Sequence, residues 1–194
     1  MTKDTVTMIV DRLFPINVGM VDNPNHHELK ELEPYIYKLS DQIKKGGDNW
    51  VSNKTYNTSQ THNVFEDKKF NKLTGWVTQQ IARYCEFLGY QGSLKTGTAW
   101  FNIYKKKDYQ EYHNHVDGSL VAVYFYKSKK DSAKFHIKSY WQSDSNEFSQ
   151  GSHTTYESKE GRLLIFNATV EHCVGPHMGK EDRISFSFNY KKIK

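Results

Sequence analysis

Two stretches in the first half of the chain repeat their apolar residues every three or four positions. This spacing places those residues on one side of an α-helix, so amphipathic helices are predicted within residues 27–47 and 70–90. Pro34 sets the start of the first helix or kinks it, and Gly46-Gly47 ends it. Gly89 is the expected C-cap of the second. The apolar stripes are Leu29, Leu32, Ile36, Leu39 and Ile43, then Phe70, Leu73, Val77, Ile81, Tyr84 and Leu88.

From about residue 98 the pattern changes to short runs rich in β-branched and aromatic residues, separated by polar and glycine-containing turns. Several short strands at this spacing predict a sandwich or jelly roll. The polar stretch 142–161 is expected to be a long loop of the kind that often covers a site. The expected strands lie within residues 98–104, 119–126, 133–141, 161–168 and 183–190.

The chain is long enough, at 194 residues, for one domain with a sizeable core, and it contains no repeat or low-complexity linker. We therefore expect a single domain over residues 1–194. Residues 1–97 would form a helix-rich support, and residues 98–194 a jelly-roll core. The expected class is α+β, mainly β.

The composition bears on possible partners of the protein and on its location in the cell. The 27 Lys and Arg exceed the 22 Asp and Glu by five, but the lysines are scattered, which favours solvated loops over a nucleic-acid surface. Mean hydropathy is −0.79, and no apolar run approaches the length of about 20 residues that a membrane span needs. The N-terminal residues lack the pattern of a secretory signal. Two cysteines in a chain of this length suggest a reducing cytosol, so a cytoplasmic location is expected.

Three groups that can bind a metal, His113, His115 and Asp117, recur at every second position just before an apolar run. On a β-strand, residues two apart face the same side, so these side chains would project together. Burying three such polar groups together in an apolar core would cost free energy, whereas at a metal ion they would serve as ligands.

A second cluster carries His172 and, eleven residues later, Arg183 at the opening of the last expected strand. Two histidines and one carboxylate on one face of an octahedral metal, with open positions opposite, are typical of non-haem iron oxygenases. A chelating 2-oxo acid at such an iron also needs a cation for its far carboxylate. The arginine fork suits that task because it binds a carboxylate through two parallel hydrogen bonds.

With these features the chain resembles 2-oxoglutarate/Fe(II)-dependent oxygenases of the prolyl-hydroxylase-like branch, in particular small bacterial and phage-type members. The resemblance covers most of the chain and is most specific from Gly161 to Asn189. The matching motifs are Leu13-Phe14-Pro15, Trp100-Phe101-Asn102, Asp108-Tyr109-Gln110, His113-Asn114-His115, Val121-Ala122-Val123-Tyr124-Phe125, Gly161-Arg162-Leu163-Leu164-Ile165-Phe166, His172-Cys173-Val174-Gly175-Pro176 and Arg183-Ile184-Ser185-Phe186-Ser187-Phe188-Asn189.

The resemblance implies a double-stranded β-helix that binds Fe(II), 2-oxoglutarate and O2. His172 would be the distal iron ligand and Arg183 the anchor of the far 2-oxoglutarate carboxylate. Ser185 would assist Arg183, and Tyr104 stands where relatives place a tyrosine that contacts the co-substrate. It also implies the cytoplasm of a bacterium or of a virus-infected host cell.

The proximal ligands stay open between two sets. His115 and Asp117 form the H-x-D pair of the usual triad and are preferred, because a carboxylate gives the ordinary charge balance for iron. The family pattern laid from Tyr104 instead selects His113 and His115, which with His172 makes an all-imidazole site.

The expected function is a hydroxylase that couples 2-oxoglutarate decarboxylation to hydroxylation of a C–H bond. Its substrate would be a small molecule or a peptidyl group, not nucleic acid or a membrane component. Two alternatives remain: a cupin-like metalloenzyme that does not use 2-oxoglutarate, and a catalytically silent jelly-roll binding domain. The sequence indicates neither the substrate nor the oligomeric state.

Overall fold

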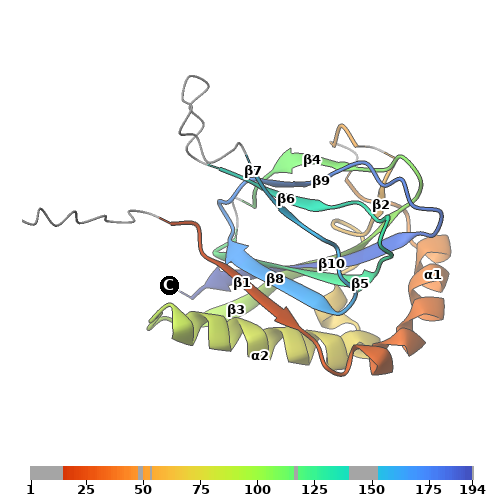
Figure 1. Ribbon diagram of the computed structural model, residues 1–194. Helices are drawn as coiled ribbons and strands as arrows, with labels where there is room; N and C mark the ends of the chain where they lie inside the picture. The colour runs from red at the N-terminus through yellow and green to blue at the C-terminus, as the bar shows by residue number, and fades with distance from the viewer. Residues whose placement is uncertain (1–14, 48–49, 53, 116–117, 140–152, 194) are drawn as a thin grey trace, which may run out of the picture.

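The computed structural model describes residues 15–47, 50–52, 54–115, 118–139 and 153–193. Two antiparallel sheets lie face to face, and helix α2 covers the outer surface of the larger one (Figure 1). This is the mainly β, α+β arrangement that the sequence predicts. No helix in these described ranges is long and apolar enough to cross a bilayer.

The larger sheet has six strands, in the order β1-β8-β5-β10-β3-β2. Its central strand β10 pairs antiparallel with both β5 and β3. The smaller sheet has four strands, in the order β4-β9-β6-β7. The strands are β1 (Val18–Asp22), β2 (Tyr56–Asn57), β3 (Leu94–Tyr104), β4 (Gln110–His113), β5 (Leu120–Lys127), β6 (Phe135–Lys138), β7 (His153–Tyr156), β8 (Arg162–Asn167), β9 (His172–Val174) and β10 (Arg183–Lys192).

Both predicted helices are present. Helix α1 (Glu33–Gln42) has Pro34 in its first turn, where the missing N–H costs nothing, and a 3-10 helix (His26–Leu32) leads into it. Helix α2 (Asn71–Phe87) ends before Gly89, whose positive φ of 66° suits a C-cap. Two further 3-10 turns precede α2, at Val64–Glu66 and Lys68–Phe70.

Strand β10 shows how one sequence pattern serves two layers. Ile184, Phe186, Phe188 and Tyr190 pack in the core between the larger sheet and the helices. Alternation then turns the intervening residues of the strand, beginning with Arg183, toward the smaller sheet. A second core between the two sheets contains Val121, Val123, Phe125, Phe135, Leu164 and Phe166. Strands β5 and β8 are covered on both faces by apolar neighbours, and their apolar runs are nearly continuous.

The five expected strands are all present, but the first half of the chain also contributes strands to the sheet. Strand β1 pairs with β8 and β2 pairs with β3, so segments predicted as helical support extend the larger sheet at both edges. Strand β7 lies in the stretch expected to be a loop, of which residues 142–152 fall outside the described ranges.

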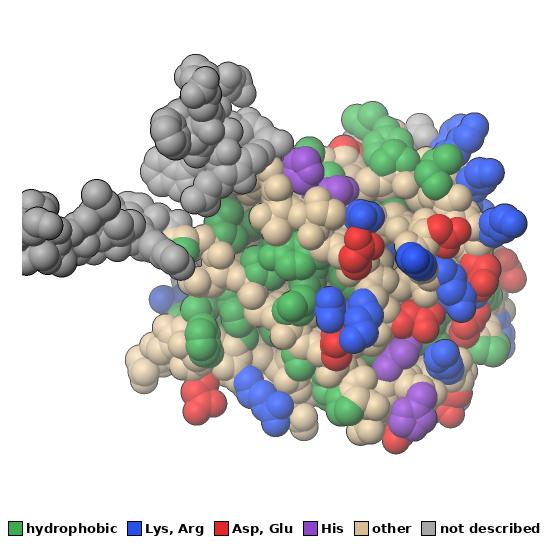
Figure 2. Space-filling model, in the orientation of Figure 1, with side chains coloured by type: hydrophobic (Ala, Val, Ile, Leu, Met, Phe, Trp, Pro, Cys, Tyr) green, Lys and Arg blue, Asp and Glu red, His purple; other side chains and the backbone are tan. Residues whose placement is uncertain are grey.

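Charged side chains are mixed on the face shown in Figure 2, where Lys and Arg alternate with Asp and Glu. Several charged side chains of the described residues form ion pairs, among them Lys127 with Glu33 and Lys134 with Glu157. This mixture agrees with the sequence-based expectation that the net positive charge is spread over solvated positions.

Candidate metal centre and co-substrate pocket

Three histidines from distant parts of the chain converge between the two sheets. His113, His115 and His172 each offer a ring nitrogen, and these nitrogens lie within 4.8 Å of one another. A metal bound to two imidazoles at about 2.1 Å holds their nitrogens at most about 4.2 Å apart. Small side-chain adjustments would therefore close all three on one ion.

The backbone explains why these histidines meet. His172 lies on β9 directly opposite His113 of β4, so cross-strand pairing brings their rings within 4.3 Å. The expected strand through His113, His115 and Asp117 ends at His113, and His115 follows in irregular chain. Its backbone N–H donates to Ala168, which turns the segment toward the cluster. Asp117 lies outside the described residues.

Hydrogen bonds fix the tautomer of all three imidazoles. Nδ1 of His113 donates to the carbonyl of Glu111 at 2.8 Å, and Nδ1 of His172 donates to the carbonyl of Val170 at 2.9 Å. Nδ1 of His115 donates to Oδ1 of Asn189 at 2.6 Å. Each Nε2 therefore carries a free lone pair, as metal-bound histidines require.

Burial keeps these imidazoles neutral. It lowers the pKa of His115 to about 4, although the hydrogen bond to Asn189 opposes the shift. Burial also lowers the pKa of His113 and holds the pKa of His172 well below its usual value. Neutral imidazoles are the form that binds a metal, so the donor set fits a borderline cation such as Fe(II).

Arg183 is a fully buried cation at the start of β10. Its Nε donates to Oγ of Ser158 at 3.1 Å and its Nη1 to Oγ of Ser185 at 3.3 Å. The guanidinium lies over the Tyr104 ring, 4.7 Å from the centroid. Burial lowers the pKa of Arg183, although the neighbouring Tyr104 hydroxyl opposes the shift.

The charge of Arg183 is not compensated within the described ranges. No carboxylate there pairs with it, and its Nη2 is buried without a hydrogen-bond partner. An unpaired buried charge is expensive, so the site fits a ligand that brings an anionic group. The residues predicted to hold a co-substrate carboxylate, Arg183, Ser185 and Tyr104, are thus brought together.

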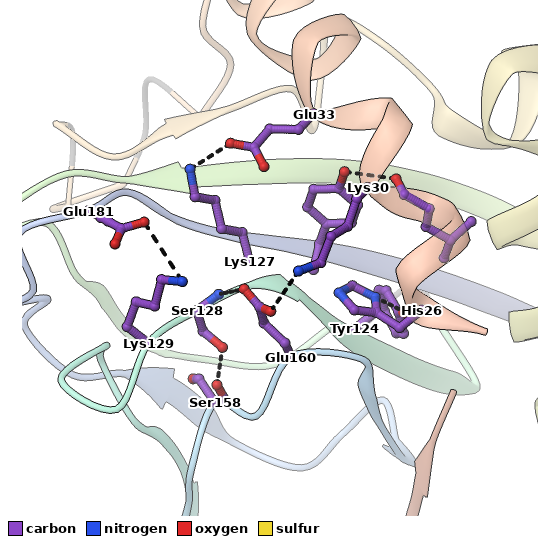
Figure 3. Close-up of polar contacts among 12 residues, drawn as sticks. His26, Lys30, Glu33, Tyr124, Lys127, Ser128, Lys129, Ser158, Glu160 and Glu181 are labelled. Carbon is purple, nitrogen blue, oxygen red and sulfur yellow. Dashed lines mark hydrogen bonds and ion pairs between the residues drawn. The ribbon is translucent and has the colours of Figure 1, made fainter. Parts of the chain in front are cut away.

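A rigid frame holds this cation in place. The Ser158 hydroxyl that accepts from Arg183 also donates to the carbonyl of Ala133 at 2.6 Å. The backbone carbonyl of Ser158 accepts from the hydroxyl of Ser128, whose N–H donates to Glu160 (Figure 3). No periodicity or motif in the sequence marks Ser158, because its partners come from distant segments.

One pocket connects His113 and His172 to the residues that neighbour Arg183. Its cavity volume is about 20 Å³, room for roughly one water molecule, so a larger ligand must displace lining side chains. Trp50, which is half-buried, lines this pocket and contacts His113, with ring centroids 5.2 Å apart. The lining residues are Trp50, Trp100, Asn102, Tyr104, Gln110, His113, Val123, Phe135, His172, Val174, Ser185 and Ser187.

A family model described as "Putative 2OG-Fe(II) oxygenase" matches residues 98–189, the segment that contains all of these candidate ligands. This segment belongs to the 2OG-Fe(II) oxygenase family. The match covers the motifs from Trp100 to Asn189 on which the resemblance to these oxygenases was based. No curated protein matches the chain in sequence.

Solved structures share the fold of this chain at low sequence identity. A prolyl-4-hydroxylase from Pseudomonas putida is 12% identical, with a TM-score of 0.66 over 91% of this chain and 93% of that one. A viral collagen prolyl hydroxylase from Paramecium Bursaria Chlorella virus-1, in its 2OG complex, is 11% identical, with a TM-score of 0.58 over 91% and 96%. A Trichoplax adhaerens prolyl hydroxylase, bound to a hypoxia inducible factor peptide fragment, is 14% identical, with a TM-score of 0.66 over 90% and 83%. These likenesses confirm the double-stranded β-helix.

Sequence reasoning missed Asn189, which orients His115. Strand alternation could have found it, because Asn189 follows Arg183 and Ser185 on the same face of one strand. Gln110 lies in the matched motif Asp108-Tyr109-Gln110 but was given no role, and neither strand alternation nor a motif marks Glu111 or Trp50. Glu111 approaches the site wall through hydrogen bonds to backbone N–H groups some 60 positions away.

Proposed function

We propose that the protein hydroxylates a C–H bond by a reaction that consumes 2-oxoglutarate and O2. The observation that carries this proposal is a neutral three-imidazole cluster at a pocket whose wall also holds Ser185 and Tyr104, the two neighbours of Arg183. Arg183 is buried and has no anionic partner in the described part of the chain. The reaction converts 2-oxoglutarate, O2 and R–H into succinate, CO2 and R–OH. One oxygen atom enters succinate and the other enters the product.

His113, His115 and His172 are the proposed iron ligands. His115 and His172 belong to both sets that the sequence left open, and His113 completes the set with a nitrogen inside the same 4.8 Å cluster. The other set replaces His113 by Asp117. The metal, when bound, supplies the activation of oxygen that no side chain can perform.

The chain's own residues bind and orient the co-substrate. We propose that Arg183 pairs with the distal carboxylate of 2-oxoglutarate through its free Nη2, with Ser185 and Tyr104 beside it. The Ser158 frame holds the guanidinium before the ligand arrives, so little ordering remains to be done on binding. The apolar wall of Val123 and Phe135 excludes water from the same pocket.

The test is a screen for succinate release with blocked peptides and small metabolites as substrates, in the presence of Fe(II), 2-oxoglutarate and O2. The proposal expects succinate and hydroxylated product in equal amounts, and none from His172→Ala. An Arg183→Ala protein that kept full activity would favour the cupin-like alternative, which does not use 2-oxoglutarate.

We also propose that residues 1–194 work as one domain, since α1 and α2 contribute to the core that backs the sheet of the site. Both cysteines, Cys85 and Cys173, are free, which suits the reducing cytoplasm proposed as its location.

A further inference from the structure

Two buried polar atoms beside the histidines lack a partner among the described residues. They are Nε1 of Trp100 and Oε1 of Gln110. Both residues line the pocket and are almost fully buried, with 6% of Trp100 and 3% of Gln110 exposed. A buried polar atom left unsatisfied costs stability, so a pair of them in one pocket indicates a ligand.

The orientation of Gln110 is set by Glu111. The Glu111 carboxylate only accepts hydrogen bonds, and it receives them from the N–H groups of Val51 and Ser52 at 2.8 and 3.2 Å. It also receives the side-chain amide Nε2 of Gln110 at 2.9 Å. The amide nitrogen of Gln110 is therefore used, and its oxygen is left as a free acceptor.

Trp100 offers the complementary group. Its indole stacks on His115, with ring centroids 5.5 Å apart and planes 19° apart, and its N–H can only donate. A second indole, Trp50, packs on His113. The N–H groups of its chain neighbours Val51 and Ser52 donate to the Glu111 carboxylate. The same carboxylate therefore orients Gln110 and holds the segment that carries Trp50.

The pair needs a ligand that carries one hydrogen-bond donor, for Oε1 of Gln110, and one hydrogen-bond acceptor, for the indole N–H of Trp100. At neutral pH 2-oxoglutarate carries only acceptors, so it cannot satisfy Oε1 of Gln110. In an extended peptide the N–H and C=O of one residue point the same way, as they do in an antiparallel strand pair. We propose that Gln110 and Trp100 bind the backbone N–H and C=O of one substrate residue, which makes the substrate an extended peptide. This inference rests on the proposed function of the histidine cluster.

The test uses the full chain loaded with Zn(II) in place of Fe(II), together with 2-oxoglutarate, so that no turnover occurs. A panel of N-acetyl tripeptide amides, one for each central amino acid, is titrated while the indole ¹H–¹⁵N signals are recorded. The Trp100 signal is assigned from Trp100→Phe. We expect at least one peptide to shift this signal.

The best peptide is then remade with each backbone N–H in turn replaced by an ester oxygen. One replacement should weaken binding to the unaltered protein about tenfold. The same replacement should cost Gln110→Met nothing, because its acceptor is already gone. Gln79→Met, altered on the exposed face of α2, should behave like the unaltered protein.

The outcomes separate the two proposals. If Zn(II) and 2-oxoglutarate fail to bind, the proposed function fails. If both bind but no peptide shifts Trp100, or every ester binds as well as its amide, the peptide inference alone is overturned. It is also overturned if Gln110→Met weakens 2-oxoglutarate binding more than it weakens peptide binding, since Gln110 would then serve the co-substrate.

Discussion

Nδ1 of His115 lies 2.6 Å from Oδ1 of Asn189 and donates a hydrogen bond to it. The amide is itself oriented, because its Nδ2 donates to Oγ1 of Thr98 at 3.0 Å. A strand residue near the end of the chain thereby fixes the tautomer of a histidine 74 positions earlier. Partners of this kind orient metal ligands and raise their basicity.

Asn189→Leu should weaken metal binding about 10- to 100-fold, because His115 loses the acceptor that fixes its ring. Calorimetric titration with Mn(II) under matched conditions measures the change. Thr98→Val is the matched control: it removes only the outer hydrogen bond and should cost less than Asn189→Leu. Equal metal affinity in Asn189→Leu and the unaltered protein would show that His115 is not a ligand.

The ligand set can be decided by two single substitutions. His113→Ala should abolish stoichiometric metal binding, since it removes one of three clustered nitrogens, whereas Asp117→Ala should retain it. Metal content after anaerobic loading with Fe(II) and desalting gives the answer. The reverse result would assign the site to His115, Asp117 and His172, the set that the H-x-D pattern favours.

Replacing Arg183 by methionine should separate binding from stability. Because its buried charge has no anionic partner in the described chain, Arg183→Met should not lower the thermal unfolding midpoint of the protein without co-substrate. Its 2-oxoglutarate affinity should fall by at least about 100-fold. Thermal unfolding with and without 2-oxoglutarate measures both.

The control for this experiment is Arg162→Met, which removes a surface arginine paired with Asp22. It should bind 2-oxoglutarate normally. If Arg183→Met were still stabilised by 2-oxoglutarate as strongly as the unaltered protein, the assignment of Arg183 would be wrong.

Asp22, the last residue of the edge strand β1, pairs with Arg162 and Lys159, and its carboxylate is protonated at acid pH. Hydrogen bonds from Arg162 and then Lys159 lower the pKa of Asp22 to about 2. A carboxyl with a lowered folded-state pKa stabilises the fold above its unfolded pKa, and that contribution is lost as pH falls through the folded value. Asp22→Asn should therefore reduce the free energy of unfolding near neutral pH by less than about 1 kcal/mol, since the pair is exposed.

This difference between Asp22→Asn and the unaltered protein should fade between about pH 4 and pH 2. Urea unfolding at a series of pH values measures it. High salt should shrink the difference at every pH, because exposed ion pairs are screened. A difference that persists unchanged at the lowest pH would mean that the ion pairs do not hold β1.

The sequence predicted those helices and strands whose apolar residues repeat at regular short spacing. Alternation on β10 separates Phe186, which faces the helices, from Arg183, which faces the site, and the spacing from His172 to Arg183 carries the family motif. Strand β1 was missed because its support is tertiary: Gly19 lets the Tyr84 ring approach closely, and a side chain there would collide with it.

Strand alternation predicted that His113 and His115 lie together because they share one face of a strand. In the structure they lie together for a different reason. The strand stops at His113, and His115 reaches the site through irregular chain held by Ala168 and Asn189. Such long-range contacts leave no periodic trace in a sequence. The same holds for the hydrogen bonds between Glu111 and the backbone near Trp50.

The central claim, that these imidazoles and Arg183 form one site for iron and 2-oxoglutarate, is tested most directly by an anaerobic spectroscopic titration. Fe(II) is added to the protein, then 2-oxoglutarate, and the visible absorbance is recorded. The account predicts a charge-transfer band that saturates with 2-oxoglutarate and is absent in His172→Ala and Arg183→Met. No band in the unaltered protein, or a band of equal strength in His172→Ala, would contradict it.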